Sequence, residues 1–270
     1  MIAWRSSPWA CKNDRLLYVA AFGDDPATAV AAATRWFQET DIEHIEYAHH
    51  RLIAAIGNRF AAHPDLEPYR SMIGRVSKQL WVRGTRAMSA LGRVTPILEE
   101  MRVPWAVVGN AVWQCKGSPL FRDVEKPELM VARAAYTFTV SRFWDAGWLP
   151  PAGSKLYGMP DPISMTDAFG NSVLLRSDSA LRDAFPALTN EELWGATAPC
   201  DAFNSLFRLP SSDIILRLCS LSEFRPIADL QWAVDLCELR QSEQDLSFER
   251  GPPAAQLKQR LKLLDGLSYE

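Results

Sequence analysis

The feature that most constrains the fold is a short apolar stretch, Trp105–Val108, set between two long regions with helical patterning. Pro104 ends the first helical pattern, and the apolar stretch runs directly into Gly109 and Asn110. A continuous apolar run of this length that stops at a turn residue is typical of a buried strand. We therefore predict an α+β fold whose sheet begins at this point.

Three further strands are expected after this stretch. Residues 127–133 form one, and the segment ISMTDAFGNSVLLRS gives two more, joined by a hairpin-type turn at Gly170–Asn171. A brief helix to Lys116 and a helix over 134–146 separate the strands. The middle of the chain, residues 96–180, is thus predicted to be a small α/β core.

Helical signals dominate on both sides of this core. Asp25 and Pro26 are a good N-cap and first-turn pair, residues 42–62 carry apolar side chains at helical spacing, and residues 67–101 form one long helix or two meeting at Pro96. On the other side, a capping box at Thr189–Glu192, a serine cap at Ser211 or Ser212 and an amphipathic stretch over 227–239 indicate helices. We predict helical regions at 1–95 and 181–270.

Composition excludes several classes of protein. Hydrophobic residues make up 48% of the 270 residues, enough for a real core, and the formal net charge is -3, so no whole-molecule attraction to nucleic acid or an anionic membrane is expected. The five cysteines form neither a CxxC motif nor a close pair, and no signal peptide or membrane span is apparent. A soluble cytoplasmic protein with reduced thiols and no metal-binding cysteine motif is the expectation.

Residues 102–133, RVPWAVVGNAVWQCKGSPLFRDVEKPELMVAR, resemble the uncharacterised nucleotidyltransferase family that is often encoded beside peptide-modifying and cell-surface biosynthetic genes. Gly109 falls on the family's glycine, Arg122 on its loop arginine and residues 126–131 on its Asp-x-Asp strand. FGNSVLLRSDSAL and DLQWAVDLCEL are similar to two later family segments, so the resemblance covers roughly residues 80 to 240. It implies a small mixed sheet of nucleotidyltransferase type flanked by N- and C-terminal helical regions.

The family's chemistry requires three carboxylates, two of them at i and i+2 on one strand, which hold two magnesium ions around a triphosphate. Here the first position is Lys126, whose ammonium repels a cation, and only Glu128 keeps the charge. The third position falls on Leu174 and a neighbouring histidine position on Arg176, and Val108 replaces the lysine before the glycine. We therefore predict a degenerate site without a bound metal or a certain cofactor.

The favoured hypothesis is a ligand- or peptide-binding accessory protein of a biosynthetic pathway that is not itself an enzyme. Its ligand is expected near six residues: Gly109, Asn110, Arg122, Lys126, Glu128 and Arg176. A structural partner in an antitoxin-like complex is a further alternative.

A competing register would restore catalysis. Asp123-Val124-Glu125 is itself an acid-x-acid triplet at a workable distance after Gly109, and with Glu128 it would give an active nucleotidyltransferase that uses NTP and magnesium to modify a small molecule or peptide. Against this register, Lys126 and Pro127 follow at once, which places the triplet in a charged loop before the strand. The loop interpretation is preferred, and Asp123, Glu125 and Glu128 remain the candidate catalytic residues.

The expected helix over 67–101 has charges of one sign over most of its length. No acidic residue lies between Glu67 and Glu99, and five basic residues fall on or beside one helical line: Arg75, Lys78, Arg83, Arg86 and Arg93. This pattern predicts an anionic partner, whether a peptide, a protein or a small molecule, but no specific nucleic acid and no membrane. The alternative is a solvated helix face without a recognition role.

Overall fold

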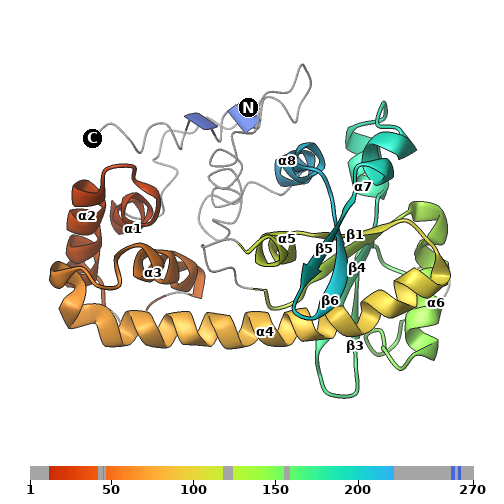
Figure 1. Ribbon diagram of the computed structural model, residues 1–270, viewed down its shortest axis with the longest axis horizontal. Helices are drawn as coiled ribbons and strands as arrows, with labels where there is room; N and C mark the ends of the chain where they lie inside the picture. Colours follow the sequence, from red (N-terminus) through yellow and green to blue (C-terminus); the bar gives the residue numbers. More distant parts are fainter. Residues whose placement is uncertain are drawn as a thin grey trace. The chain divides into compact units, whose positions relative to one another are not determined.

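A computed structural model of the chain describes residues 12–41, 45, 47–117, 124–154, 159–221, 257–258 and 261–262 (Figure 1). The chain divides into two compact units. The described residues between 12 and 80 belong to the first, and those at 81–117 and between 124 and 221 belong to the second. This division differs from the three regions predicted at 1–95, 96–180 and 181–270, because one helix runs across residue 95 and the second unit continues to residue 221.

The first unit is helical. It contains α1 (Lys12–Phe22), α2 (Pro26–Glu39), α3 (Tyr47–Phe60), the 3₁₀ segment η2 (Pro64–Tyr69) and the start of α4. The predicted cap of α2 is confirmed, because the Asp25 carboxylate accepts the backbone N–H of Thr28 at 2.9 Å. Arg59 of α3 caps the C-terminal end of α1 by donating hydrogen bonds to the carbonyl oxygens of Ala21 and Gly23, both at 2.7 Å. The helix expected over 42–62 is described from Tyr47 onward.

Helix α4 (Arg70–Met101) is one continuous helix that passes through Pro96. Proline has no N–H to donate to the carbonyl four residues earlier, which here belongs to Gly92. The Thr95 hydroxyl donates to that carbonyl at 3.2 Å and so supplies the missing donor. Of the two predicted outcomes, one long helix or two, the single helix is therefore the observed one.

The second unit is built on a four-stranded mixed sheet. Its strands are β1 (Trp105–Val108), β2 (Glu128–Val131), β3 (Ile163–Thr166) and β4 (Ser172–Ser177), in the order β1-β2-β4-β3. The β2–β4 pair is parallel, whereas β1–β2 and β3–β4 are antiparallel. Helix α5 (Asn110–Cys115) follows β1, and α6 (Tyr136–Asp145) follows β2. The predicted α+β class with a small mixed sheet is confirmed.

The two faces of this sheet differ in chemistry. On one face Val107, Leu129, Leu175 and Ile163 are adjacent in register and buried. On the other face, Val108 and Met130 join a hydrophobic cluster with residues of α7 (Ser179–Ala184), the turn region that follows it, and α8 (Ser212–Leu221). The members contributed by these later segments are Leu181, Leu188, Leu193 and Ile214. Elements after the sheet therefore cover the apolar part of this second face.

The region predicted as helical at 181–270 contains strands at 198–209. These residues form an antiparallel hairpin, β5 (Ala198–Ala202) and β6 (Ser205–Leu209). Phe203 and Asn204 both have positive φ, 51° and 57°, as a tight two-residue turn requires. The predicted capping box is present, since Thr189 and Glu192 exchange hydrogen bonds, but it leads only into a π-helical turn, Glu191–Gly195.

Arg208 of the hairpin binds Glu99 of α4 with two hydrogen bonds, at 2.7 and 3.0 Å. These bonds hold the pKa of the Glu99 carboxyl below its ordinary value, with a further hydrogen bond from the Trp105 indole. Ser211 caps α8 as predicted, by accepting the N–H of Ile214. The amphipathic stretch predicted at 227–239 lies outside the described residues. None of the helices among the described residues is long and apolar enough to span a bilayer.

Candidate functional site

The candidate site begins where β1 ends, at Gly109. This residue precedes α5 and has φ 64° and ψ −149°, a backbone conformation that is essentially restricted to glycine. A β-carbon at this position would lie 3.1 Å from Oε1 and 3.2 Å from Cδ of Glu128. Glycine is thus required for its backbone conformation and for the close approach of the Glu128 carboxylate.

The sheet register then places the other predicted positions beside Glu128. Val108 of β1, Glu128 of β2, Leu174 of β4 and Ser164 of β3 are register partners in one row across the sheet. Register partners present their side chains on the same face. This is the row in which the resemblance predicts carboxylates, and among its members only Glu128 carries one.

The sheet contains only two charged residues, and they form an ion pair with each other. The four strands, WAVV, ELMV, ISMT and SVLLRS, contain one acidic residue, Glu128, and one basic residue, Arg176. Arg176 lies two residues beyond Leu174 on the same face, and its Nη2 is 3.4 Å from Oε2 of Glu128. The two side chains are 33% and 29% exposed. The sheet therefore presents one half-exposed ion pair on an otherwise uncharged surface.

Arg176 retains unused hydrogen-bonding capacity. Its Nε is buried, and no hydrogen-bond acceptor is found for it among the described residues. A contact of 3.4 Å is also longer than the 2.7–2.9 Å typical of charge-assisted hydrogen bonds. The guanidinium can consequently donate to a further oxyanion.

The residues of this row do not fit a pair of magnesium ions. Magnesium requires an octahedral set of oxygen ligands, and the sheet offers one carboxylate flanked by Leu174 and neutralised by Arg176. No group of three or more His, Cys, Asp or Glu side chains that could hold a metal ion is found within the described part of the chain. A guanidinium beside a glycine turn has donors of the kind that can bind an oxyanion.

The structure separates the predicted site residues into groups. Gly109, Glu128 and Arg176 come together at the end of β1, and Asn110 follows as the first residue of α5. Lys126 and Glu125 lie before β2 begins, and both are exposed. The strand predicted at 127–133 is thus shorter, Glu128–Val131, because Pro127 cannot donate a ladder hydrogen bond and Arg133 begins a 3₁₀ turn. Arg122 and Asp123 lie outside the described residues.

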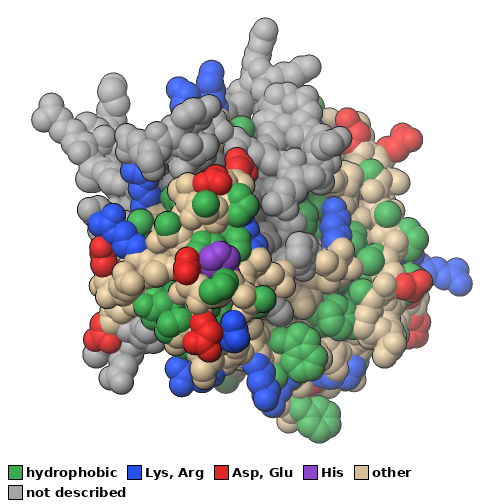
Figure 2. Space-filling view, turned by 60° about the vertical axis from the view of Figure 1, so that its left-hand side comes forward, with side chains coloured by type: hydrophobic (Ala, Val, Ile, Leu, Met, Phe, Trp, Pro, Cys, Tyr) green, Lys and Arg blue, Asp and Glu red, His purple; other side chains and the backbone are tan. Residues whose placement is uncertain are grey.

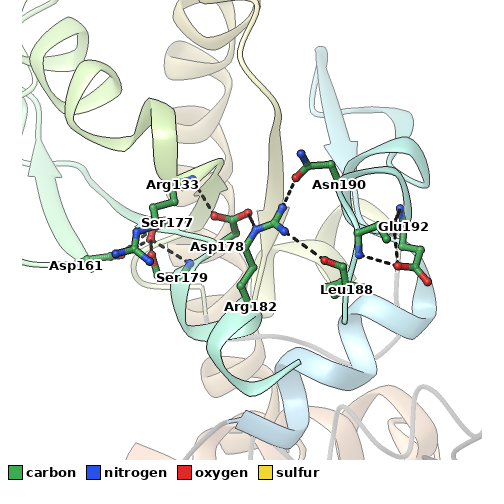
Figure 3. Close-up of polar contacts among 10 residues, drawn as sticks. Arg133, Asp161, Ser177, Asp178, Ser179, Arg182, Leu188, Asn190 and Glu192 are labelled. Atoms are coloured by element: carbon green, nitrogen blue, oxygen red, sulfur yellow. Dashed lines mark hydrogen bonds and ion pairs between the residues drawn. The ribbon is translucent and has the colours of Figure 1, made fainter. Parts of the chain in front are cut away.

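A second polar cluster, which sequence reasoning missed, lies at the other end of the β2–β4 pair (Figure 3). Asp178 is 1% exposed, and its carboxylate accepts the backbone N–H of Arg133 at 2.8 Å and Nε of Arg182 at 2.5 Å. Ser177 donates its backbone N–H, at 2.9 Å, and its hydroxyl to the Asp161 carboxylate. Arg182 also donates to the Leu188 carbonyl and the Asn190 side chain.

This cluster anchors the chain where β4 passes into α7. Its charges are satisfied by bonds to backbone and side chains from four separate segments. Part of it could have been found from the sequence, because Asp178 and Arg182 are four residues apart, the spacing of a helical ion pair. The partners Arg133 and Asp161 are too distant in sequence to be inferred.

The basic residues of α4 are engaged to different degrees. Arg75, Lys78 and Arg86 are exposed, and Arg83 is half-buried. On the face shown in Figure 2, Lys and Arg side chains recur along the lower part together with large hydrophobic and some acidic side chains. The charge there is interspersed with other side chains and does not form an unbroken basic patch.

Arg93 has a structural partner in the second unit. Its Nη2 is 2.6 Å from Oδ2 of Asp167, in the turn between β3 and β4. Burial alone would raise the pKa of Asp167, but hydrogen bonds from the Asn171 backbone and side chain, from Arg93 and from the Phe169 backbone hold that pKa below its ordinary value. The Arg93 charge is therefore committed within the fold.

Cys115, at the end of α5, lacks the properties of a nucleophile. Burial, together with the nearby Cys200, raises the pKa of its thiol to about 12. The reactive species of cysteine is the thiolate, which such a pKa suppresses at neutral pH.

Comparison with known proteins adds a fold likeness only. No protein-family model matches the sequence, and no curated protein matches it. Among solved structures, the chain is similar to an antigenic nucleotidyltransferase-like protein from Paracoccidioides brasiliensis, with 15% sequence identity and a TM-score of 0.43. The match covers 68% of this chain and 88% of that one. At this level of similarity no residue role transfers from that protein.

Proposed function

We propose that this chain is a nucleotidyltransferase-fold protein with a degenerate metal site, which binds an anionic ligand or peptide as a cytoplasmic accessory protein of a biosynthetic pathway. The observation that carries the proposal is the content of the sheet, whose single carboxylate, Glu128, is paired with its single cation, Arg176. Transfer of a nucleotidyl group needs several carboxylates to hold magnesium, whereas binding an anion needs a cation with donors to spare.

The same groups support a role in ligand binding. A half-exposed guanidinium beside the glycine turn at Gly109 offers directional donors, while Leu174, which is partly exposed, adds apolar surface beside Glu128. Such a combination suits a ligand with an anionic group and an apolar body. The pathway itself is supported only by the resemblance of residues 102–133.

Calorimetric titration with ATP, CTP, GTP and UTP, with and without magnesium, tests the proposal. We expect weak binding whose affinity changes by less than about twofold on addition of magnesium, because too few oxygen ligands are present to hold the ion. A magnesium-dependent gain of more than about tenfold in affinity would show that a metal site exists and would overturn the proposal.

The alternative of an active nucleotidyltransferase predicts a different result for one variant. If Asp123 and Glu125 are magnesium ligands together with Glu128, Asp123→Asn abolishes nucleotidyl transfer. In the proposed binding protein the same substitution alters neither the free energy of unfolding nor ligand binding appreciably. An assay with α-labelled NTPs on both proteins, with Glu67→Gln as the charge-matched control, separates the two hypotheses.

The proposed anionic partner can be tested on α4 as well. Arg75 and Arg86 are exposed, and no ion pair of either is found among the described residues. Exchange of either for glutamine is expected to weaken binding of an acidic partner, and the wild-type affinity should fall with added salt, since exposed charges are screened over about 8 Å at physiological ionic strength. Retention of full affinity across a salt series would show that these residues belong to a solvated helix face without a recognition role.

A further inference from the structure

We infer that Glu128 is an internal competitor for Arg176, so that an anionic ligand binds by displacing the Glu128 carboxylate. This inference rests on the proposed function and adds a specificity-determining residue to the same site. It assigns to Glu128 the opposite role from that of a magnesium ligand.

The position of the Glu128 carboxylate is the first observation. It lies over Gly109, close enough that a β-carbon there would be 3.1 Å from Oε1. Its other oxygen, Oε2, is 3.4 Å from Arg176 Nη2. The carboxylate therefore occupies the space above the glycine backbone and contacts the guanidinium with one oxygen. A ligand that binds Arg176 above Gly109 meets this carboxylate first.

The weakness of the pair is the second observation. Both side chains are about a third exposed, and the contact joins one nitrogen to one oxygen at 3.4 Å. Exposed pairs of this kind contribute little because water competes for both charges. In the same unit, the carboxylate of Asp178 is buried and receives two short hydrogen bonds. The ion pair between Glu128 and Arg176 is thus weak enough for a ligand to compete with it.

The donors of Arg176 define the ligand class. Its buried Nε finds no acceptor in the described part of the chain, and Nη2 faces Glu128. A guanidinium presents parallel donors that match the paired oxygens of a phosphate or a carboxylate. An oxyanion with two free oxygens can accept from both nitrogens, which the Glu128 carboxylate does not do. The ligand is therefore a phosphate- or carboxylate-bearing molecule.

A titration in magnesium-free buffer tests the inference, with inorganic pyrophosphate and a triglutamate peptide as the two probes. Glu128→Gln keeps the shape of the side chain and removes its charge. We expect it to bind at least one probe about fivefold more tightly than the wild type, the factor that corresponds to an exposed ion pair near the upper end of its range. Preference for pyrophosphate would identify a phosphate ligand, and preference for the peptide a carboxylate ligand.

The control is Glu67→Gln, which makes the same change in net charge at an exposed carboxylate in η2. It is expected to leave both affinities unchanged within about twofold. Glu128→Ala should reproduce the gain of Glu128→Gln if the gain comes from loss of the carboxylate. Arg176→Gln should abolish binding, and the double variant should show no gain. Circular dichroism and thermal unfolding confirm that each variant is folded.

Each outcome bears on a different statement. If Glu128→Gln binds no more tightly than Glu67→Gln while Arg176→Gln loses binding, the competitor role of Glu128 is wrong and the anion site stands. If Glu128→Gln loses binding, Glu128 contacts the ligand directly and the inference is overturned. If no variant binds either probe, the proposed function fails together with the inference.

Discussion

The two ends of the parallel β2–β4 pair differ in how their charged side chains are buried and hydrogen-bonded. At the Glu128 end, a half-exposed carboxylate and guanidinium share one contact of 3.4 Å, and a buried Arg176 nitrogen finds no acceptor among the described residues. At the Val131 end, Asp178 is buried and its carboxylate is bonded to Arg133 and Arg182. The strands are the same, so the difference lies in the loops and helices that meet each end.

This difference separates charges that hold the fold from charges that are available to a ligand. Burying a carboxylate is costly unless hydrogen bonds and an opposite charge compensate, and the Asp178 cluster supplies both. A pair that remains half-exposed avoids that cost and keeps donors in reserve. The Asp178 end therefore holds the fold, and the recognition that we propose belongs to the Glu128 end.

The largest expected effect is on stability at the Asp178 end. Asp178→Ala leaves the Arg182 guanidinium and the Arg133 N–H without their carboxylate partner, and should lower the free energy of unfolding by about 3–5 kcal/mol. Urea denaturation measures this loss. Asp183→Ala, in the same helix but exposed, is the matched control and should change stability by less than about 0.5 kcal/mol. Equal losses of unfolding free energy in the two variants would show that the Asp178 cluster does not stabilise the fold more than an exposed charge does.

An intermediate effect is expected where Arg93 binds Asp167. Arg93→Gln removes a contact of 2.6 Å to a carboxylate that is 10% exposed, and should lower the free energy of unfolding by about 1 kcal/mol at neutral pH. Arg86→Gln, on the same helix, is the control and should have almost no effect. The comparison shows that exposure alone does not identify a charge that is available to a ligand, because Arg93 is 43% exposed and still stabilises the fold.

The pH dependence of this effect follows from the Asp167 pKa. Hydrogen bonds hold that pKa below its value in the unfolded chain, so the stabilisation is present above the unfolded carboxyl pKa of about 4 and is lost as the pH falls through the folded value. The difference in stability between the wild type and Arg93→Gln should accordingly shrink on acidification. A difference that stays constant from pH 7 to pH 2 would contradict this account of the ion pair.

The sequence predicted the Glu128 end better than the Asp178 end for a physical reason. Side chains alternate along a strand, so once β2 and β4 are recognised, Glu128, Leu174 and Arg176 fall on positions whose chemistry can be judged without coordinates. The Asp178 cluster depends on Arg133 and Asp161, which come from other segments. Only the Asp178–Arg182 spacing could be read locally.

The hairpin and the charges of α4 were also hard to predict, because both depend on contacts between distant parts of the chain. Burial alternates along β6, but its sequence, SLFRL, places two apolar residues, Leu206 and Phe207, side by side, so the alternation could not be predicted from it. The capping box at Thr189 favoured a helix instead, and tertiary packing allowed only one π-helical turn. Arg93 was grouped with the other basic residues of its helix because its partner, Asp167, is 74 residues away.

The smallest expected effect on stability is at the Glu128 end, and it is the sharpest test of the comparison. Arg176→Met removes the ion pair with Glu128 but also removes the buried Nε for which no acceptor is found among the described residues. Loss of an exposed pair costs less than about 1 kcal/mol, and removal of an unsatisfied buried donor recovers a similar amount. The free energy of unfolding should therefore stay within about 1 kcal/mol of the wild type, while pyrophosphate or triglutamate binding is lost. A loss of stability comparable to that of Asp178→Ala would show that Arg176 holds the sheet together. Its guanidinium would then serve the fold and would not be available for the recognition that we propose at this end.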